Sequence, residues 1–273
     1  MTKKIVRVED AADPVLDPYL RIRERDLVGR DGQFVAEGEV VVRVLAFESP
    51  YRTRSLMLEE RRVEAMRDVI DRMPDDVPAY VVPQKVMDAV VGFHIHRGVL
   101  ALGDRGDPMH PESMLLGSGV AVALVGLANH DNVGGIFRNA AAFGARGVLV
   151  DAETCDPLYR KSVRVSVGGA LVVPFARCES ETVMLDVIER AGYEAIALTP
   201  RGEISIDELP PCDKRVLMLG TEGEGLPDHV LARARPVRID MAPGKKIDSL
   251  NVAVASGIAL HAATALARRQ PRT

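Results

Sequence analysis

Two hydrophobic patterns alternate along the chain: short apolar runs, and longer stretches in which apolar residues recur every three or four positions. In the first third, the short runs predict strands at 33–38, 55–58, 79–83 and 98–103. The periodic stretches predict helices at 39–47, 59–73 and 84–92. The helix at 59–73 rests on four apolar residues that share one face: Val63, Met66, Ile70 and Met73. This alternation indicates a small α/β/α domain, which we place with an N-terminal extension at residues 1–103.

Residues 104–118 carry glycine, proline and polar residues without a period, which predicts an interdomain linker. Beyond them the apolar runs are almost uninterrupted, as in strands that are covered on both faces. These strands are expected at 119–127, 147–150, 170–175, 194–199, 215–220 and 236–240. Helical stretches lie between most of them, and a final helix is expected at 250–268. The pattern predicts an open parallel α/β sheet over residues 119–273.

Composition narrows the class of protein. The 273 residues are 47% hydrophobic, and no window is long and apolar enough to span a bilayer. The N-terminus lacks the apolar segment of a signal peptide, so we expect a cytoplasmic protein. A net charge of −4 argues against a protein that coats nucleic acid by bulk electrostatics, and it leaves room for a local basic patch.

Several residue clusters have ordinary interpretations. The arginine-rich stretches 21–30 and 51–62 also carry acids, which favours solvated helical or loop faces. His94 and His96 favour one inward and one solvated histidine over a metal site. The three cysteines match no metal-binding spacing and are expected to be reduced, buried thiols: Cys155, Cys178 and Cys212.

Ligands of open parallel sheets lie beyond the carboxyl ends of the strands, where three unusual loops are predicted. The first, "NHDNVGGIFRNAAAFG" at 129–144, contains Arg138 directly after Ile136 and Phe137. A guanidinium is costly to desolvate without a partner. We therefore expect Arg138 to meet an anion or another polar group.

The second loop, 219–227, has glycines at 220, 223 and 225 that would let the backbone approach a ligand closely. It matches neither a dinucleotide nor a P-loop fingerprint, and Glu222 and Glu224 would repel a phosphate. A ligand with a positive centre or amide-reading edges fits better. A tight turn before a helix is the structural alternative.

In the third loop, 240–257, Ser249 is expected to cap the final helix. The small residues Ala253, Ala255 and Gly257 favour close packing of a buried core helix. Asn251 differs from them, because an amide in the first turn of a buried helix needs hydrogen-bond partners.

Together the three loops resemble motifs one, two and three of the SpoU/TrmH family of RNA ribose 2′-O-methyltransferases. The matching segments are "NVGGIFRNAAAFGA", "LMLGTEGEGLP" and "IDMAPGKKIDSLNVAVASGIALH", in the family's order and spacing. The resemblance covers residues 119–268, and residues 30–103 more loosely resemble the family's N-terminal substrate-binding domain. It implies a parallel-sheet SPOUT methyltransferase domain with a deep C-terminal trefoil knot, preceded by a small α/β/α RNA-binding domain.

The resemblance also implies a homodimer that binds S-adenosylmethionine in the knot and meets RNA across the dimer interface, with no metal and no membrane. The methyl donor would contact Thr199, Leu219, Gly220, Ile239, Met241 and Leu250.

Arg138 matches the family's catalytic arginine, in an Asn-x-Gly-x-x-x-Arg element that begins at Asn132. A guanidinium with a pKa above about 12 is a poor base. We expect Arg138 to fork onto an RNA phosphate and the 2′-hydroxyl, and the final proton acceptor stays open. Asn132 would be a hydroxyl or phosphate contact, and Glu222 would fix the loop or the arginine.

Ser249 and Asn251 would be polar elements of the knot helix. Asn139 stands where the family more often has a small hydroxyl residue, which should alter local contacts and not the reaction.

These features favour an enzyme acting on structured RNA. Large-subunit ribosomal RNA is preferred over tRNA, because the N-terminal domain resembles that of members acting on ribosomal RNA. Two other classes are weighed: a non-catalytic RNA-binding protein that kept the knot fold, and a nucleotide-binding oxidoreductase. The intact motif residues argue against the first, and the missing phosphate fingerprint argues against the second.

Overall fold

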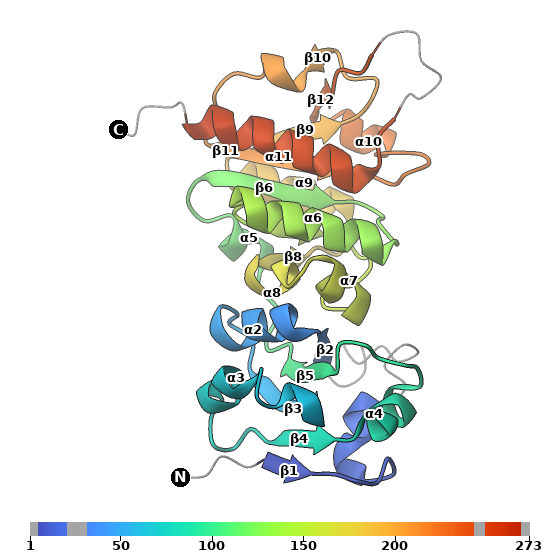
Figure 1. Ribbon diagram of the computed structural model, residues 1–273. Coiled ribbons are helices and arrows are strands. Elements are labelled where there is room, and N and C mark those ends of the chain that lie inside the picture. Colours follow the sequence, from blue (N-terminus) through green and yellow to red (C-terminus); the bar gives the residue numbers. More distant parts are fainter. Residues whose placement is uncertain (1–4, 21–31, 243–248, 269–273) are drawn as a thin grey trace. The chain divides into compact units, whose positions relative to one another are not determined.

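The computed structural model describes residues 5–20, 32–242 and 249–268. The chain divides into two compact units (Figure 1). The first contains Met1–Asp107 and Asp156–Val172, and the second contains Pro108–Cys155 and Val173–Thr273. The expected boundaries differ from these, because they assigned 156–172 to the second domain and treated 104–118 as a linker. The predicted mixed α/β fold with a parallel sheet is confirmed.

The first unit is built on a five-stranded mixed sheet with the order β1-β4-β3-β5-β2. The strands are β1 Ile5–Arg7, β2 Gln33–Glu37, β3 Thr53–Glu59, β4 Ala79–Val82 and β5 Val99–Asp104. The helices are η1 Pro14–Tyr19, α2 Glu39–Phe47, η2 Glu60–Arg62, α3 Arg67–Arg72 and α4 Gln84–Val91. β5 runs antiparallel to β2 and β3, and the other pairings are parallel. Four strands and two helices therefore form where the apolar pattern predicted them.

The predicted helix at 59–73 is wrong. β3 continues to Glu59, whose backbone N–H donates to the carbonyl of Gly98. The Glu59 carboxylate then accepts from the backbone and side chain of Arg61, which starts the short helix η2. The α-helix begins only at Arg67. Met66, Ile70 and Met73 are still buried, so the period identified the core residues and misplaced the helix start.

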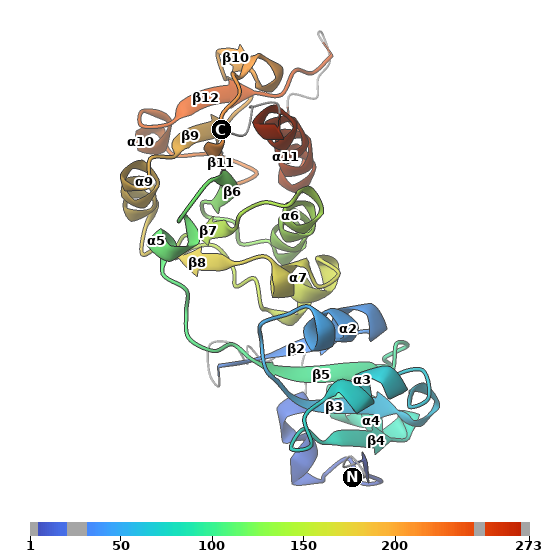
Figure 2. The same ribbon diagram turned by 90° about the vertical axis from the view of Figure 1, so that its left-hand side faces the viewer.

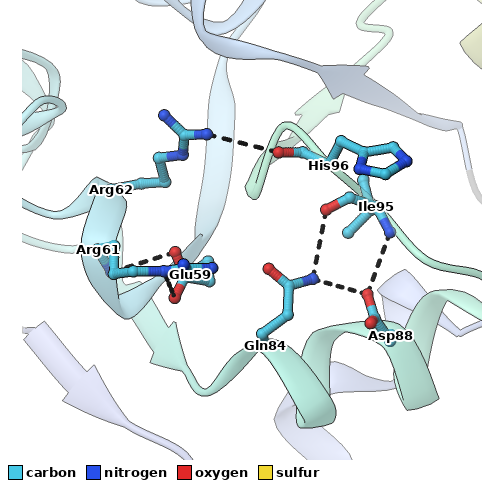
Figure 3. Close-up of polar contacts among 7 residues, drawn as sticks. All are labelled: Glu59, Arg61, Arg62, Gln84, Asp88, Ile95 and His96. Carbon is cyan, nitrogen blue, oxygen red and sulfur yellow. Dashed lines mark hydrogen bonds and ion pairs between the residues drawn. The ribbon is translucent and has the colours of Figure 1, made fainter.

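A loop after α4 is fixed by the carboxylate of Asp88 (Figure 3). Asp88 Oδ1 accepts from Gln84 Nε2 at 2.7 Å and from the backbone N–H of Ile95 at 3.1 Å. Ile95 is buried, whereas His94 and His96 on either side of it are both exposed. The expected inward histidine is therefore wrong, because the alternation turns Ile95 inward. The carbonyl of His96 accepts from Arg62 Nη2.

The arginines of 51–62 are largely held by acids, as a solvated, charge-balanced surface requires. Arg52 pairs with Asp76 at 2.6 Å, and Arg54 pairs with Asp104 at 2.7 Å. The other expected basic cluster, 21–30, lies outside the described residues.

Residues 156–172 form α7 Arg160–Val165 and α8 Gly169–Val172, which belong to the first unit. The guanidinium of Arg160 pairs with the buried carboxylate of Glu37 on β2, and it lies 5.5 Å from the centre of the Phe93 ring. Burial lowers the pKa of Arg160, and the Glu37 carboxylate opposes that shift. A second cation, Arg164, approaches Glu37 at 3.7 Å. This buried cluster anchors the segment to the first unit.

The second unit is built on a seven-stranded parallel sheet with the order β10-β12-β9-β11-β6-β7-β8. The strands are β6 Gly119–Leu124, β7 Val148–Val150, β8 Phe175–Arg177, β9 Glu194–Leu198, β10 Ile204–Ser205, β11 Lys214–Leu219 and β12 Arg235–Arg238. The helices are α5 Pro111–Met114, α6 His130–Phe143, α9 Glu181–Arg190, η3 Ile206–Glu208, α10 Asp228–Leu231 and α11 Val252–Arg268. Figure 2 shows α6 and α11 side by side on one face of the sheet, with α9 and α10 on the other.

The predicted strand at 170–175 is also wrong. Its first residues form α8, and β8 begins only after Pro174. Proline has no N–H to donate to a neighbouring strand, so the ladder starts beyond it. The Pro174 carbonyl still accepts from Val148 at the start of β7.

The expectation of three buried thiols holds for one cysteine only. Of the cysteines, Cys178 is buried, which raises the pKa of its thiol to about 11, but Cys155 and Cys212 are only half-buried. Across the described residues, no helix is long and apolar enough to cross a membrane. The same part of the chain contains no group of three His, Cys, Asp or Glu residues that could hold a metal ion.

Candidate active site

A cavity of about 560 Å³ lies beyond the carboxyl ends of β9, β11 and β12. Its volume is typical of small-molecule sites, which span roughly 300–1,000 Å³. Its walls come from the turn after β9, the loop after β11, the segment after β12 and the start of α11. All six residues expected to contact the methyl donor line it: Thr199, Leu219, Gly220, Ile239, Met241 and Leu250. The structure thus brings together residues that are up to 51 positions apart in the chain.

The loop after β11 closes on itself between Thr221 and Gly225. Each of these residues donates its backbone N–H to the carbonyl of the other, at 3.2 Å in both directions. A Cβ at Gly220 would overlap the backbone of Gly225. We expected the glycine to leave room for a ligand, but the group that approaches it most closely is the loop itself. The loop therefore forms the tight turn that was the structural alternative, and the same turn lines the cavity.

Asn132 joins the three predicted motifs. It lies in the first turn of α6 and is 5% exposed. Its Nδ2 donates to the Glu222 carboxylate on the second loop, and its Oδ1 accepts from Asn251 Nδ2 at 2.9 Å. Both ends of the Asn132 amide are therefore occupied by side chains from the other two motifs.

Asn251, not Ser249, caps the final helix. α11 begins at Val252, and Asn251 Oδ1 accepts from the backbone N–H groups of Ala253 at 3.0 Å and Val254 at 3.3 Å. The expectation for Ser249 is wrong because the helix starts too late for its side chain to reach the first free N–H groups. Ser249 lines the cavity instead. The expectation that Asn251 needs partners is confirmed.

Asn132, Glu222 and Asn251 form a hydrogen-bonded group, the Asn132 cluster. Arg138 is not part of it. Ile136 and Phe137 are fully buried, whereas Arg138 is exposed on the other side of α6. Within the ranges that the structure describes, its guanidinium makes no hydrogen bond or ion pair. Its apolar neighbours do not desolvate it, so that premise is wrong. A cation without a protein partner is available to an external anion.

Asn139 connects α6 to α11. Its Nδ2 donates to the carbonyl of Ala253 at 2.7 Å and to Ser256 Oγ at 3.0 Å. One turn earlier, a Cβ at Gly135 would lie only 2.8 Å from Cβ of Ala253, so the two helices are in close contact there. The small residues of α11 therefore permit close packing as expected, although Ala253, Ala255 and Gly257 are half-buried rather than fully buried.

Sequence reasoning missed the residues that hold the segment between β6 and α6. The buried Asp151 accepts from the backbone N–H of Gly126 at 2.9 Å, and Thr154 Oγ1 accepts from that of Leu127 at 3.2 Å. These bonds fix the approach to α6 and hence to Asn132. One signal was present: Asp151 directly follows a fully apolar strand, and an acid that is buried there needs a polar partner.

Comparisons with known proteins agree with this geometry. The model of the SpoU rRNA methylase family matches residues 119–261. An uncharacterized tRNA/rRNA methyltransferase of Mycobacterium tuberculosis is 35% identical over 266 residues, which cover 93% of this chain and 90% of the relative.

Two solved structures extend the likeness to nearly the whole chain. The AdoMet-bound rRNA methyltransferase of Sinorhizobium meliloti has a TM-score of 0.81 at 24% identity and covers 95% of this chain and 97% of its own. A putative RNA methyltransferase of the TrmH family from Porphyromonas gingivalis has a TM-score of 0.78 at 26% identity and covers 94% and 99%. The chain therefore belongs to the SpoU rRNA methylase family and is an RNA methyltransferase.

Proposed function

We propose that the protein transfers a methyl group from S-adenosylmethionine to a ribose 2′-hydroxyl of structured RNA, with large-subunit ribosomal RNA as the preferred substrate. The observation that carries the proposal is the cavity, which gathers all six expected cofactor residues beside Glu222 of the Asn132 cluster. The name of the Sinorhizobium meliloti structure states that AdoMet is bound there, which supports the same cofactor here.

The cavity residues fit this cofactor. Leu219, Ile239 and Leu250 supply apolar walls for an adenosine, and Glu222 and Glu224 supply negative charge for a cationic donor. When bound, the cofactor supplies an electrophilic methyl group on a positively charged sulfur. The chain must then orient the nucleophilic hydroxyl in line with that group.

Arg138 is the residue best suited to orient the substrate. Its exposed guanidinium has no partner in the described chain and can fork onto two oxygens, one of a phosphate and one of the ribose. Asn132 has both amide atoms engaged, so we assign it a positioning role that holds Glu222 and Asn251 in place. The group that accepts the hydroxyl proton stays open.

The proposal includes a homodimer in which RNA approaches across the interface, in the cytoplasm. The dimer is supported by the apolar side chains of Val254 and Ile258 on α11, which are 53% and 40% exposed. The trefoil knot stays a prediction, because residues 243–248 of the third motif lie outside the described residues.

Two alternatives keep the same fold. The protein could act on tRNA, since the name of the Mycobacterium tuberculosis relative covers both tRNA and rRNA. A non-catalytic RNA-binding protein is disfavoured, because Asn132, Glu222 and Asn251 form one connected hydrogen-bonded cluster. A decayed site would have lost such a network.

Two experiments test the proposal. Calorimetry with S-adenosylhomocysteine, and with NAD as a control, should show binding of the first alone. Ribose methylation is then mapped by resistance to alkaline cleavage in ribosomal RNA and tRNA from a deletion strain, complemented with the wild-type or the Arg138→Ala gene. We expect one ribosomal position to lose its methyl group and to regain it only with the wild type. Loss at a tRNA position would select the tRNA alternative, and an unchanged map with base methylation would refute 2′-O transfer.

A further inference from the structure

We propose that Arg201 binds the α-carboxylate in the amino-acid tail of the methyl donor and thereby selects donors that carry this group. The inference rests on the proposed function and assigns one more residue to the same site. Arg201 lies in the turn after β9, is exposed and lines the cavity. In the part of the chain that the structure describes, no acid pairs with its guanidinium.

The backbone beneath Arg201 is held firmly. Its N–H donates to Thr199 Oγ1 at 3.3 Å, and the N–H of Gly202 donates to the Thr199 carbonyl at 3.1 Å. Arg238 Nη1 in turn donates to the carbonyl of Gly202 at 3.2 Å. A Cβ at Gly202 would overlap the backbone of Val237, so the turn is in close contact with β12. The cation is presented from a fixed turn and not from a free loop, which reduces the entropy lost on binding.

The charges of the cavity match those of the donor. S-adenosylmethionine carries two positive centres, the sulfonium and the ammonium, and one negative centre, the carboxylate. Glu222 and Glu224 suit the two positive centres. Among the described lining residues, Arg201 is the only cation, so it is the one charged group there that suits the carboxylate.

An RNA phosphate is the other anion that an exposed arginine beside this cavity could bind. The two assignments differ in which ligand loses affinity when Arg201 is replaced. A contact with the carboxylate changes the affinity for the donor in the absence of RNA. A contact with phosphate changes the KM for RNA and leaves donor binding unaltered.

The test measures the affinity of the whole chain, without RNA, for S-adenosylhomocysteine and for its decarboxylated analogue, which keeps the ammonium. The variants are Arg201→Gln and Arg201→Lys. Arg190→Gln is a matched control, because Arg190 is an exposed arginine of the same unit that pairs with Glu112 on α5 and does not line the cavity.

We expect Arg201→Gln to weaken S-adenosylhomocysteine binding about three- to tenfold, as for a partly exposed charge-assisted pair. The decarboxylated analogue should bind both proteins equally, Arg201→Lys should recover part of the loss, and the control should match the wild type. Equal losses for both ligands would show a structural role and overturn the inference. Unchanged donor binding with a raised KM for RNA would assign Arg201 to the phosphate. If neither ligand binds the wild type, the cofactor assignment itself fails.

Discussion

The guanidinium of Arg138 is exposed and unpaired within the described chain. Replacing it should therefore affect methyl transfer if its role is catalytic, and stability if its role is structural. We expect Arg138→Ala to leave the melting temperature and the affinity for S-adenosylhomocysteine nearly unchanged. Methyl transfer should fall roughly a hundredfold to a thousandfold, equivalent to about 2.7–4 kcal/mol of lost transition-state stabilisation. Arg138→Lys should recover little, because an ammonium lacks the planar fork that holds two oxygens.

Calorimetry, thermal melts and single-turnover transfer on the three proteins decide the matter. A lysine variant with near-normal transfer would contradict the forked contact. A large drop in melting temperature for the alanine variant would show that the residue supports the fold.

Apart from the cavity residues, which the resemblance to a family supplied, individual residues were predictable only where local geometry decides. Asn251 needs partners because it stands at a helix start, and it has them. Arg138 was misjudged because flanking residues on a helix point in different directions, so Ile136 and Phe137 can be buried beside an exposed cation. The partners of Asn132 lie 90 and 119 positions away, and no local pattern could reveal those pairings.

The loop after β11 is an element whose shape depends on one glycine. Gly220→Val should disrupt it, because a side chain there overlaps the backbone of Gly225. We expect a loss of about 1–3 kcal/mol of stability, as for overpacked sites, together with loss of S-adenosylhomocysteine binding. Gly223→Ala in the same loop is the control for stability, since a Cβ there meets no protein atom within 4 Å. A Gly220→Val protein that is as stable as Gly223→Ala and binds the ligand like the wild type would contradict this account of the loop.

The contact between α6 and α11 gives a second prediction at this scale. Asn139→Ala removes two hydrogen bonds to α11 and should lower the free energy of unfolding by about 1–3 kcal/mol in urea titrations. Transfer by the folded variant should stay close to the wild-type rate, because Asn139 contacts α11 and not the cavity. Ala142→Ser, at an exposed position of α6, is the control and should change neither quantity. A selective loss of transfer would instead place Asn139 in the reaction.

Elements were predicted well wherever the apolar period and a glycine or proline boundary agreed, as in β2, α2 and the parallel strands β6, β7, β9, β11 and β12. They failed where a tertiary bond overrode the period. Glu59 stays in β3 because the carbonyl of Gly98 accepts its N–H, so the helical pattern that follows it starts late. Pro174 delays β8 for the opposite reason, because it lacks the N–H that the ladder requires.

At the scale of the whole molecule, the first unit depends on a segment from the middle of the chain. Arg160 is paired with Glu37 across 123 positions, and the carboxylate is only 5% exposed. Arg160→Met should destabilise the first unit by about 3–5 kcal/mol, because it leaves a buried carboxylate with only the more distant Arg164. Adding Glu37→Gln removes that charge and should restore most of the loss. Hydrogen exchange of the β2 amides would measure the stability of the first unit in both variants. A double variant that is no more stable than the single one would contradict the argument.

The proposed homodimer can be tested through the exposed apolar side chains of α11. Val254 and Ile258 are one helical turn apart on α11, and both side chains are apolar and exposed, so together they offer an apolar surface to a second copy of the chain. Light scattering should give about twice the 29.6 kDa of one chain. Val254→Asp would place a charge on that surface and should shift the protein to a monomer.

Arg138 is not part of the Asn132 cluster of its own chain, so in the proposed homodimer it would act on RNA at the site of the partner. The monomeric variant should therefore keep its affinity for S-adenosylhomocysteine and lose methyl transfer. Ala142→Ser again serves as the control. A Val254→Asp monomer that transfers methyl groups at the wild-type rate would show that one chain contains the complete site. In that case Arg138 must reach the substrate from its own chain.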